Sequence, residues 1–365
     1  MRLDFFPSRR LTLYLAKTFV IRIFAVLAML VLVLQILDLL GASGRILEAE
    51  GNGEGALWTY VSLRVPQLIA RFLPYSVLLA TIITLATMNQ NSEVVAMKSA
   101  GMSAHQILAP LVLTAMVIAA ISFAFNERIV TRATATLSAW EKAEFGPIPE
   151  ESDTRTNVFV ADGDAILAAK TASGSGDAMV LTGVAWYRRD PQQMLSEQWR
   201  AERATYTPNG WRLENPQRFN VTTATQETLP SAIVAKDVTP AEIAISSVNP
   251  DAQTLPELSR SIDALKAADR RTAELEGKWW HKISGPLSAV LMPLLGAVAA
   301  FGLARSGQVL MRAVIGMALG FAYFVVDNAA IAVGNFGGYP PMLAAWGPFL
   351  LFLLIGETVL IRTEE

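Results

Sequence analysis

Long apolar stretches alternate with short polar ones along this chain, and the apolar stretches fall into two groups of three. The first group comprises residues 23–40, 58–88 and 107–125, and the second comprises residues 283–303, 313–333 and 342–361. Each stretch is long enough to cross the hydrocarbon core of a bilayer as a helix; residues 23–40 would extend about 27 Å. The pattern therefore predicts six membrane-spanning helices in a three-plus-three arrangement.

A polar insert with a different periodicity separates the two groups. Short apolar segments alternate there with turn sequences, notably Asp162-Gly163-Asp164 and Pro208-Asn209-Gly210, and the last expected strands are residues 219–225 and 232–234. Such turns predict β-hairpins, and a succession of short strands predicts a β-sandwich or jelly roll. Residues 256–268 then show the spacing of an amphipathic helix.

These elements predict three parts. Residues 1–125 hold spans one to three, with a short helix at about residues 89–102 between the second and third spans. Residues 126–275 form the β domain, which ends in the amphipathic helix, and residues 276–365 hold spans four to six.

The distribution of Lys and Arg predicts the orientation of the spans, because these residues gather on the cytoplasmic side. With the N-terminus inside, the inner segments hold Arg2, Arg9, Arg10, Lys17, Lys98, Arg305, Arg312 and Arg362. The first outer loop holds Arg45 with three glutamates, and the loop at residues 334–341 has no charge. Both termini are therefore expected in the cytoplasm and the β domain outside it.

Composition supports a membrane protein and excludes several functions. The chain is 52% hydrophobic and 17% charged, with mean hydropathy +0.37, which is unusual for a soluble protein of 365 residues. A net charge of -2 argues against non-specific nucleic-acid binding. The absence of cysteine excludes disulfides and thiolate chemistry, and two distant histidines, His105 and His281, do not suggest a metal site. Since no nucleotide-binding or hydrolase motif is present, we expect a non-catalytic chain without its own cofactor or metal.

The polar segment at residues 89–102 carries the strongest functional signal. Ser92 is a candidate N-cap, Glu93 suits the helix dipole in the first turn, and Gly101 stands where a helix should stop. One interpretation is a solvated linker. The other is an interface helix that seats in a groove of a partner protein, with its carboxylate facing an arginine. The candidate coupling residues are Ser92, Glu93, Val94, Met97, Lys98, Gly101 and Met102.

Polar residues inside the spans form a second candidate site. Arg64, Gln67 and Arg71 share one helix face, where they either extend to the headgroups or form a basic wall for the phosphates of an anionic lipid. Asp38 is expected at the interface near a span end, whereas Asp327 lies mid-span, where a hydrogen bond between helices is favoured over a proton relay. The candidate lipid-binding residues are Gln35, Asp38, Arg64, Gln67, Arg71, Arg128 and Arg132.

Three segments give the chain a resemblance to a known family. They are Ser92-Glu-Val-Val-Ala-Met-Lys-Ser-Ala-Gly101, Lys278-Trp-Trp-His-Lys-Ile-Ser-Gly-Pro-Leu-Ser288 and Gly338-Tyr-Pro-Pro-Met-Leu-Ala-Ala-Trp-Gly-Pro348. Together with the three-plus-three spans and the β insert, they resemble the lipopolysaccharide export permeases of the LptF/LptG (YjgP/YjgQ) family. The last segment resembles the LptG branch more closely.

This resemblance implies a subunit of an ABC-type exporter in the inner membrane of a Gram-negative bacterium, with its β domain in the periplasm. The implied partners are a paralogous LptF-type permease, an LptB-type ATPase dimer that uses ATP and magnesium, an LptC-type single-span protein and a periplasmic jelly-roll bridge. The implied substrate is lipopolysaccharide, and Glu93 matches the acid of the family's coupling helix. Gln35 and Gln67 stand where the family often has basic residues, so phosphate contact is expected to shift to Arg64 and Arg71.

Two alternatives from other classes remain. One is a non-transporting scaffold or receptor whose β domain binds a periplasmic partner. The other is a mechanotransmission permease that works a periplasmic enzyme.

Overall fold

The computed structural model describes residues 7–49, 51–146, 155–174, 176–192, 194–221, 223–246, 249–267, 271–301 and 309–364. Of the residues used above, Arg2, Leu303 and Arg305 lie outside this described part of the chain. The chain divides into a helical unit and a β unit. The helical unit contains residues up to Leu137, Asp251–Ser259 and the residues from Thr272 onward, and the β unit contains Ser138–Pro250 and Arg260–Arg271.

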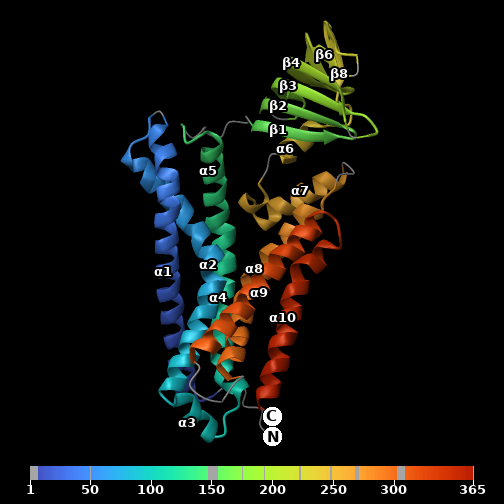
Figure 1. The fold of residues 1–365 in the computed structure, drawn as a ribbon. Coiled ribbons are helices and arrows are strands. Elements are labelled where there is room, and N and C mark those ends of the chain that lie inside the picture. The colour runs from blue at the N-terminus through green and yellow to red at the C-terminus, as the bar shows by residue number, and fades with distance from the viewer. Residues whose placement is uncertain are drawn as a thin grey trace. The chain divides into compact units, whose positions relative to one another are not determined.

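Long helices make up most of the helical unit (Figure 1). They are α1 (Arg9–Glu48), α2 (Glu54–Gln90), α3 (Glu93–Ser99), α4 (Ala104–Phe125), α8 (Ala273–Phe301), α9 (Val309–Asn335) and α10 (Pro341–Glu364). The start of α1, the end of α10 and the short helix α3 lie at one end of this unit (Figure 1). The basic residues Arg9, Arg10, Lys17, Lys98 and Arg362 belong to these same segments.

Five helices in the described residues are long and apolar enough to cross a membrane. They are Arg9–Glu48, Glu54–Gln90, Ala104–Lys142, Val314–Asn335 and Pro341–Arg362. The expected fourth span falls on α8, a helix of 29 residues that is not among these five. The three-plus-three count of six spans therefore stays a prediction.

The helix that begins with α4 continues past the expected end of the third span. A five-residue π-helical segment, η1 (Asn126–Val130), joins α4 to α5 (Thr131–Lys142). Val130, Ala133 and Leu137 are buried at helical spacing, which explains why the helix persists although its sequence turns polar.

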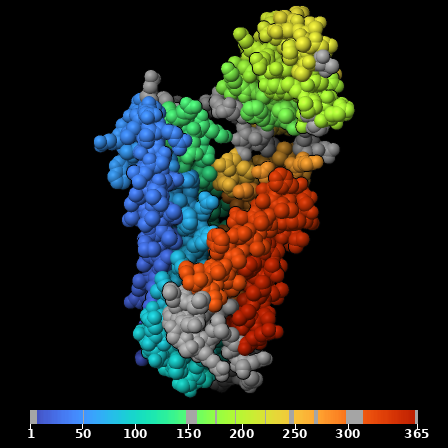
Figure 2. Space-filling model, viewed as in Figure 1, coloured from blue at the N-terminus to red at the C-terminus, as the bar shows by residue number. Residues whose placement is uncertain are grey.

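The core of the helical unit is centred on α2. In the most apolar 18-residue stretch of α2, 61% is buried, against 22% in the corresponding stretches of α1 and α9. Side chains of α1, α2, α3, α4, α8, α9 and α10 all contribute to that core. Small residues permit close approach: a Cβ added at Gly296 of α8 would lie 2.8 Å from Thr81 Cγ2 of α2. The helix α1 is drawn in blue in Figure 2, and its residues Phe24, Leu32 and Leu37 are exposed.

The described residues of the β unit form an antiparallel sheet of eight strands (Figure 1). The strands are β1 (Arg155–Asp162), β2 (Ala165–Ser173), β3 (Val180–Arg189), β4 (Leu195–Thr207), β5 (Gly210–Glu214), β6 (Gln217–Asn220), β7 (Thr225–Thr228) and β8 (Ser231–Val234). The path runs β1-β2-β3-β4-β5-β8, and β6 pairs with β4 and β7. An antiparallel β region is thus confirmed, whereas a sandwich or jelly roll stays a prediction.

In the described part of the chain, four short helical elements lie within or after the strands in the sequence: one between β2 and β3, and three after β8. They are the 3-10 segments η2 (Gly176–Ala178) and η3 (Pro250–Ala252) and the helices α6 (Pro240–Ser246) and α7 (Leu255–Ala267). The last of these confirms the amphipathic helix expected at residues 256–268.

Both predicted hairpin turns are present. Asp162 pairs with Ala165 across a two-residue loop, and Thr207 pairs with Gly210 across another. The single strand expected at residues 219–225 is wrong, because this segment contains the turn between β6 and β7. The Asn220 side chain accepts a hydrogen bond from the Thr223 N–H (3.1 Å), and Ala224 has φ +51°, so the backbone reverses there.

Candidate coupling site and polar clusters of the helical unit

The predicted short helix exists as α3, with its end formed as expected. Gly101 has φ +85°, its N–H donates to the Lys98 carbonyl (3.0 Å), and the Met102 N–H donates to the Met97 carbonyl (3.1 Å). This pair of bonds is a Schellman motif, which favours glycine at the left-handed position. Ser92 precedes the helix with φ 60°, and its side chain makes no capping bond, so the expected Ser92 cap is absent.

The two faces of α3 differ in burial. Val94 and Met97 pack into the chain's own core, with 6% and 9% of their surface exposed. On the opposite face Val95 is 60% exposed. Ser92, Ala96, Lys98, Ser99, Ala100 and Gly101 are also exposed, and Met102 is half-buried. We call Val95, Ala96, Ser99 and Ala100 the outer face of α3; it is small and largely uncharged.

Neutral donors hold the Glu93 carboxylate. The Tyr14 hydroxyl of α1 donates to both of its oxygens (3.2 and 3.4 Å), and the Asn91 amide donates to Oε1 (3.5 Å). In the described part of the chain no lysine or arginine forms an ion pair with Glu93. Among the described residues, the charge of Glu93 is therefore not balanced by a cation.

The candidate lipid site contains an internal polar cluster that the sequence did not predict. Arg64 forms a bidentate ion pair with Asp38 (Nη2–Oδ1 3.0 Å, Nε–Oδ2 3.1 Å). The Tyr60 hydroxyl donates to Asp38 (2.7 Å), and Arg64 also donates to the Gln67 side chain (2.9 Å). Asp38 is thus paired and not merely exposed at the interface, and the charge of Arg64 is compensated within the chain.

The other candidates for lipid contact do not join this cluster. Gln35 is 8% exposed, and among the described residues neither polar atom of its amide has a partner. Arg71, Arg128 and Arg132 are exposed and form no ion pair with another described residue. The arrangement leaves three uncompensated cations at the surface, while Arg64 is occupied.

Two further contacts join helices of the helical unit. Asp327 of α9 and His281 of α8 form a hydrogen bond (Oδ2–Nε2 3.1 Å), as the favoured interpretation of Asp327 predicted. His105, at the start of α4, contacts Glu357, near the end of α10 (3.3 Å). In the described residues no group of three or more His, Asp or Glu side chains could hold a metal ion.

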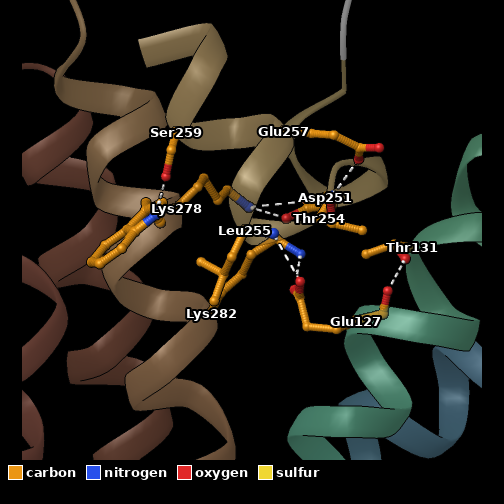
Figure 3. Close-up of polar contacts among 10 residues, drawn as sticks. Glu127, Thr131, Asp251, Thr254, Leu255, Glu257, Ser259, Lys278 and Lys282 are labelled. Carbon is orange, nitrogen blue, oxygen red and sulfur yellow. Dashed lines mark hydrogen bonds and ion pairs between the residues drawn. The ribbon is translucent and has the colours of Figure 1, made fainter. Parts of the chain in front are cut away.

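A further polar cluster surrounds Glu127 in the π-helical segment (Figure 3). Its Oε1 accepts from Lys282 Nζ of α8 (3.2 Å), and its Oε2 accepts from the backbone N–H of Leu255, the first residue of α7 (2.8 Å). Nearby, Lys278 pairs with Asp251 (3.1 Å) and Trp279 Nε1 donates to Ser259 Oγ (2.9 Å). These pairs could not be predicted from the sequence, since Glu127 and Lys282 lie 155 residues apart.

These features define a multi-span helical membrane protein with an inserted antiparallel β unit and a short helix between its second and third long helices. The family model of the lipopolysaccharide export system permease LptF/LptG matches residues 13–362. The chain therefore belongs to the LptF/LptG family of lipopolysaccharide export permeases.

Named relatives are similar to this chain along most of its length. The LptG permease proteins of two Escherichia coli strains, K12 and O6:H1, are each 25% identical over 366 residues, covering 98% of this chain and 99% of theirs. LptG of Haemophilus influenzae is 24% identical over 322 residues, covering 86% of this chain and 89% of its own. All three carry the LptG name, in agreement with the branch that the sequence suggested.

Proposed function

We propose that this chain is the LptG-type permease subunit of an ABC-type exporter that extracts lipopolysaccharide from the outer leaflet of the inner membrane and passes it to a periplasmic bridge. Family membership supports the substrate and the transport system. The outer face of α3 and the uncompensated Glu93 support the attachment of a motor. The proposed arrangement has both termini and α3 in the cytoplasm and the β unit, folded as a jelly roll, in the periplasm.

The observation that carries this proposal is the division of α3 into an anchored and an exposed face. Val94 and Met97 fix the helix to the core of the helical unit, so a displacement of α3 is passed on to the long helices. The outer face consists of small side chains that fit a groove. Glu93 adds a carboxylate that forms no ion pair within the described chain and that an arginine or lysine of a partner would neutralise.

In the proposed mechanism the ATPase dimer does the chemistry, and the permease converts its movement. ATP and magnesium bind to the LptB-type subunits, and this chain binds neither. Closure of the ATPases displaces α3, and the cavity between this chain and its LptF-type paralogue collapses. Such work is needed because each CH₂ group of an acyl chain is worth about 0.8 kcal/mol in the bilayer.

The lipid phosphates are proposed to meet the exposed cations Arg71, Arg128 and Arg132. Arg64 takes a different role, since its bidentate pair with Asp38 would have to break before it could bind phosphate. Within this proposal, Asp38, Arg64 and Gln67 fix α1 against α2. Gln35 is buried on α1, three residues before Asp38. Its amide is proposed to contact the polar part of the lipid. An LptC-type single-span protein completes the partners.

The experiment that tests the proposal is co-purification from membranes. Affinity-tagged wild-type chain is expected to retain the ATPase subunit, and Glu93→Arg is expected to lose it because two cations would then face each other. Glu274→Arg reverses an exposed charge at the start of α8 and serves as the matched control. A scaffold or receptor would retain no ATPase in any variant, and that result would reject the exporter.

A further inference from the structure

The chain passes between its two units four times, after Leu137, Pro250, Ser259 and Arg271. Close in sequence to these four crossings, on the side of the helical unit, lie the residues of one polar cluster. We name it the connector clasp and define it by Glu127, Asp251, the Leu255 N–H, Ser259, Lys278, Trp279 and Lys282 (Figure 3). Any force that the backbone carries from one unit to the other passes through these segments.

Glu127 is the centre of the connector clasp because it serves two partners at once. One carboxylate oxygen binds Lys282 of α8, and the other accepts the N–H at the first residue of α7. The first N–H groups of a helix have no partner within the helix, and a carboxylate there also interacts favourably with the helix dipole. Figure 3 shows Glu127 pointing from its own helix toward both partners.

At the centre of the clasp, the Glu127–Lys282 pair has little access to water, whereas Asp251 at its edge is exposed. The Glu127 side chain is 17% exposed and that of Lys282 is 9% exposed. A buried ion pair is weak evidence for stability, since an apolar pair of similar shape is often as stable. Its charges and its geometry instead suit a positioning role.

The local backbone supports such a role. Glu127 belongs to a π-helical segment between two α-helices, and such segments are frequent at functional sites. The Thr131 hydroxyl donates to the Glu127 carbonyl (2.8 Å), so a side chain takes part in the hydrogen bonding of this irregular turn.

We propose that Glu127 is a positioning residue that fixes the first turn of α7 to α8 and to the third long helix, so that movement of the long helices is delivered to the segments leading into the β unit. This inference rests on the proposed function. It adds a residue, remote from α3, that governs how much lipid each ATP moves.

Paired substitutions separate the roles of charge and capping. Glu127→Gln with Lys282→Met removes both charges but keeps an acceptor for the Leu255 N–H. Glu127→Leu with Lys282→Met removes the charges and the acceptor. Neither pair leaves one buried charge alone. Glu197→Gln with Arg218→Met removes an ion pair of the β unit (2.7 Å) and serves as the control.

Hydrogen exchange of the full-length permease tests the geometry directly. The Leu255 amide is expected to exchange about fivefold faster in the Leu/Met pair, as for a lost helix cap. It should remain at the wild-type rate in the Gln/Met pair and in the control. Equal exchange in the Leu/Met pair and the wild type would overturn the assignment of Glu127 as the cap of α7.

Transport by the assembled complex tests the role. With fluorescent lipopolysaccharide in proteoliposomes, the Leu/Met pair should hydrolyse ATP at the wild-type rate but move several-fold less lipid per ATP. The Gln/Met pair and the control should resemble the wild type. A purely structural role would lower hydrolysis and transfer together, and that outcome, or an unchanged ratio, would overturn the proposal. Failure of the proposed function is distinguishable, because it would appear as loss of ATPase co-purification in the wild-type chain.

Discussion

The two ends of the helical unit treat acidic side chains in opposite ways. Glu127 is mostly buried, with a lysine and a backbone N–H as partners inside the chain. Glu93, beyond the other end of α4, is partly exposed, and its donors among the described residues are neutral. A buried charge costs much free energy unless another group of the chain compensates it. A solvated carboxylate does not need such a partner. The comparison indicates that the end with Glu127 is held together by contacts within the chain, whereas the end with α3 fits the binding role proposed for it.

The largest expected effect comes from breaking the buried pair on one side only. Lys282→Met leaves the Glu127 charge without its cation and should destabilise the helical unit by about 3–5 kcal/mol. Adding Glu127→Gln should recover most of that loss. Thermal unfolding of the purified permease in detergent measures both, and equal midpoints for the single and double variants would contradict the importance of this charge balance.

A smaller loss is expected at the Asp38–Arg64 cluster, which is partly exposed. Asp38→Asn removes a charged acceptor from Arg64 and Tyr60 and should cost about 1.5–3 kcal/mol of stability.

Arg71 is an exposed cation without an ion pair in the described chain. Arg71→Gln should therefore leave the unfolding midpoint unchanged but weaken stimulation of the ATPase by lipid. The same two measurements on both variants separate a structural cation from a lipid-binding one; a reversed result would exchange their roles.

Burial within α3 sharpens the comparison at the end that carries Glu93. Val94→Ala removes buried methyl groups and should lower stability by about 1–2 kcal/mol while the ATPase stays bound. Val95→Asp should leave stability unchanged but release the ATPase, because a charge would enter the interface. Unfolding midpoints and co-purification are compared for both. If Val94→Ala released the ATPase and Val95→Asp did not, the assignment of the two faces would be inverted.

The smallest effect concerns a charged pair on the β unit. Partial burial opposes ionisation of Glu197, but hydrogen bonds from Arg218 and Trp199 outweigh it, so the pKa of Glu197 lies below its ordinary value of 4.5. Because the pKa is lowered in the folded state, the pair stabilises the β unit at pH values above 4.5. This stabilisation is lost as the pH falls through the lowered pKa.

Because Arg218 is about one third exposed (34%), the effect should stay well under about 1 kcal/mol. Hydrogen exchange in β4 of the full-length protein, compared at each pH with Glu197→Gln, measures it. The variant should differ from the wild type at neutral pH and converge with it in acid. A difference that grows in acid would refute the sign.

The spacing of apolar and turn residues predicted the helices and strands of this chain better than it predicted which side chains contact one another. The hairpins at Gly163 and Gly210 and the stop at Gly101 follow from local backbone preferences, so the sequence sufficed for them. The extension of the third long helix was missed because Asn126 and Glu127 interrupt the apolar stretch. The buried spacing of Val130, Ala133 and Leu137 was the available signal.

Only part of the candidate sites could be predicted from the sequence, because their contacts depend on how the helices pack. Arg64 and Asp38 were both selected, but their pairing depends on how α1 and α2 pack, which periodicity does not encode. Val94 and Met97 were assigned to a partner interface because an apolar stripe looks the same whether it faces the chain's own core or another protein. Their place in the core emerged only from the tertiary structure.

The most direct test of the central claim is cysteine cross-linking along α3 in the assembled complex, since the chain has no native cysteine. A cysteine at Val95 or Ser99, on the outer face, should cross-link to the ATPase subunit in membranes, and the yield should change with bound nucleotide. A cysteine at Met97, in the core, should not. Absence of ATPase cross-links from both outer positions, in complexes that still hydrolyse ATP, would contradict the account.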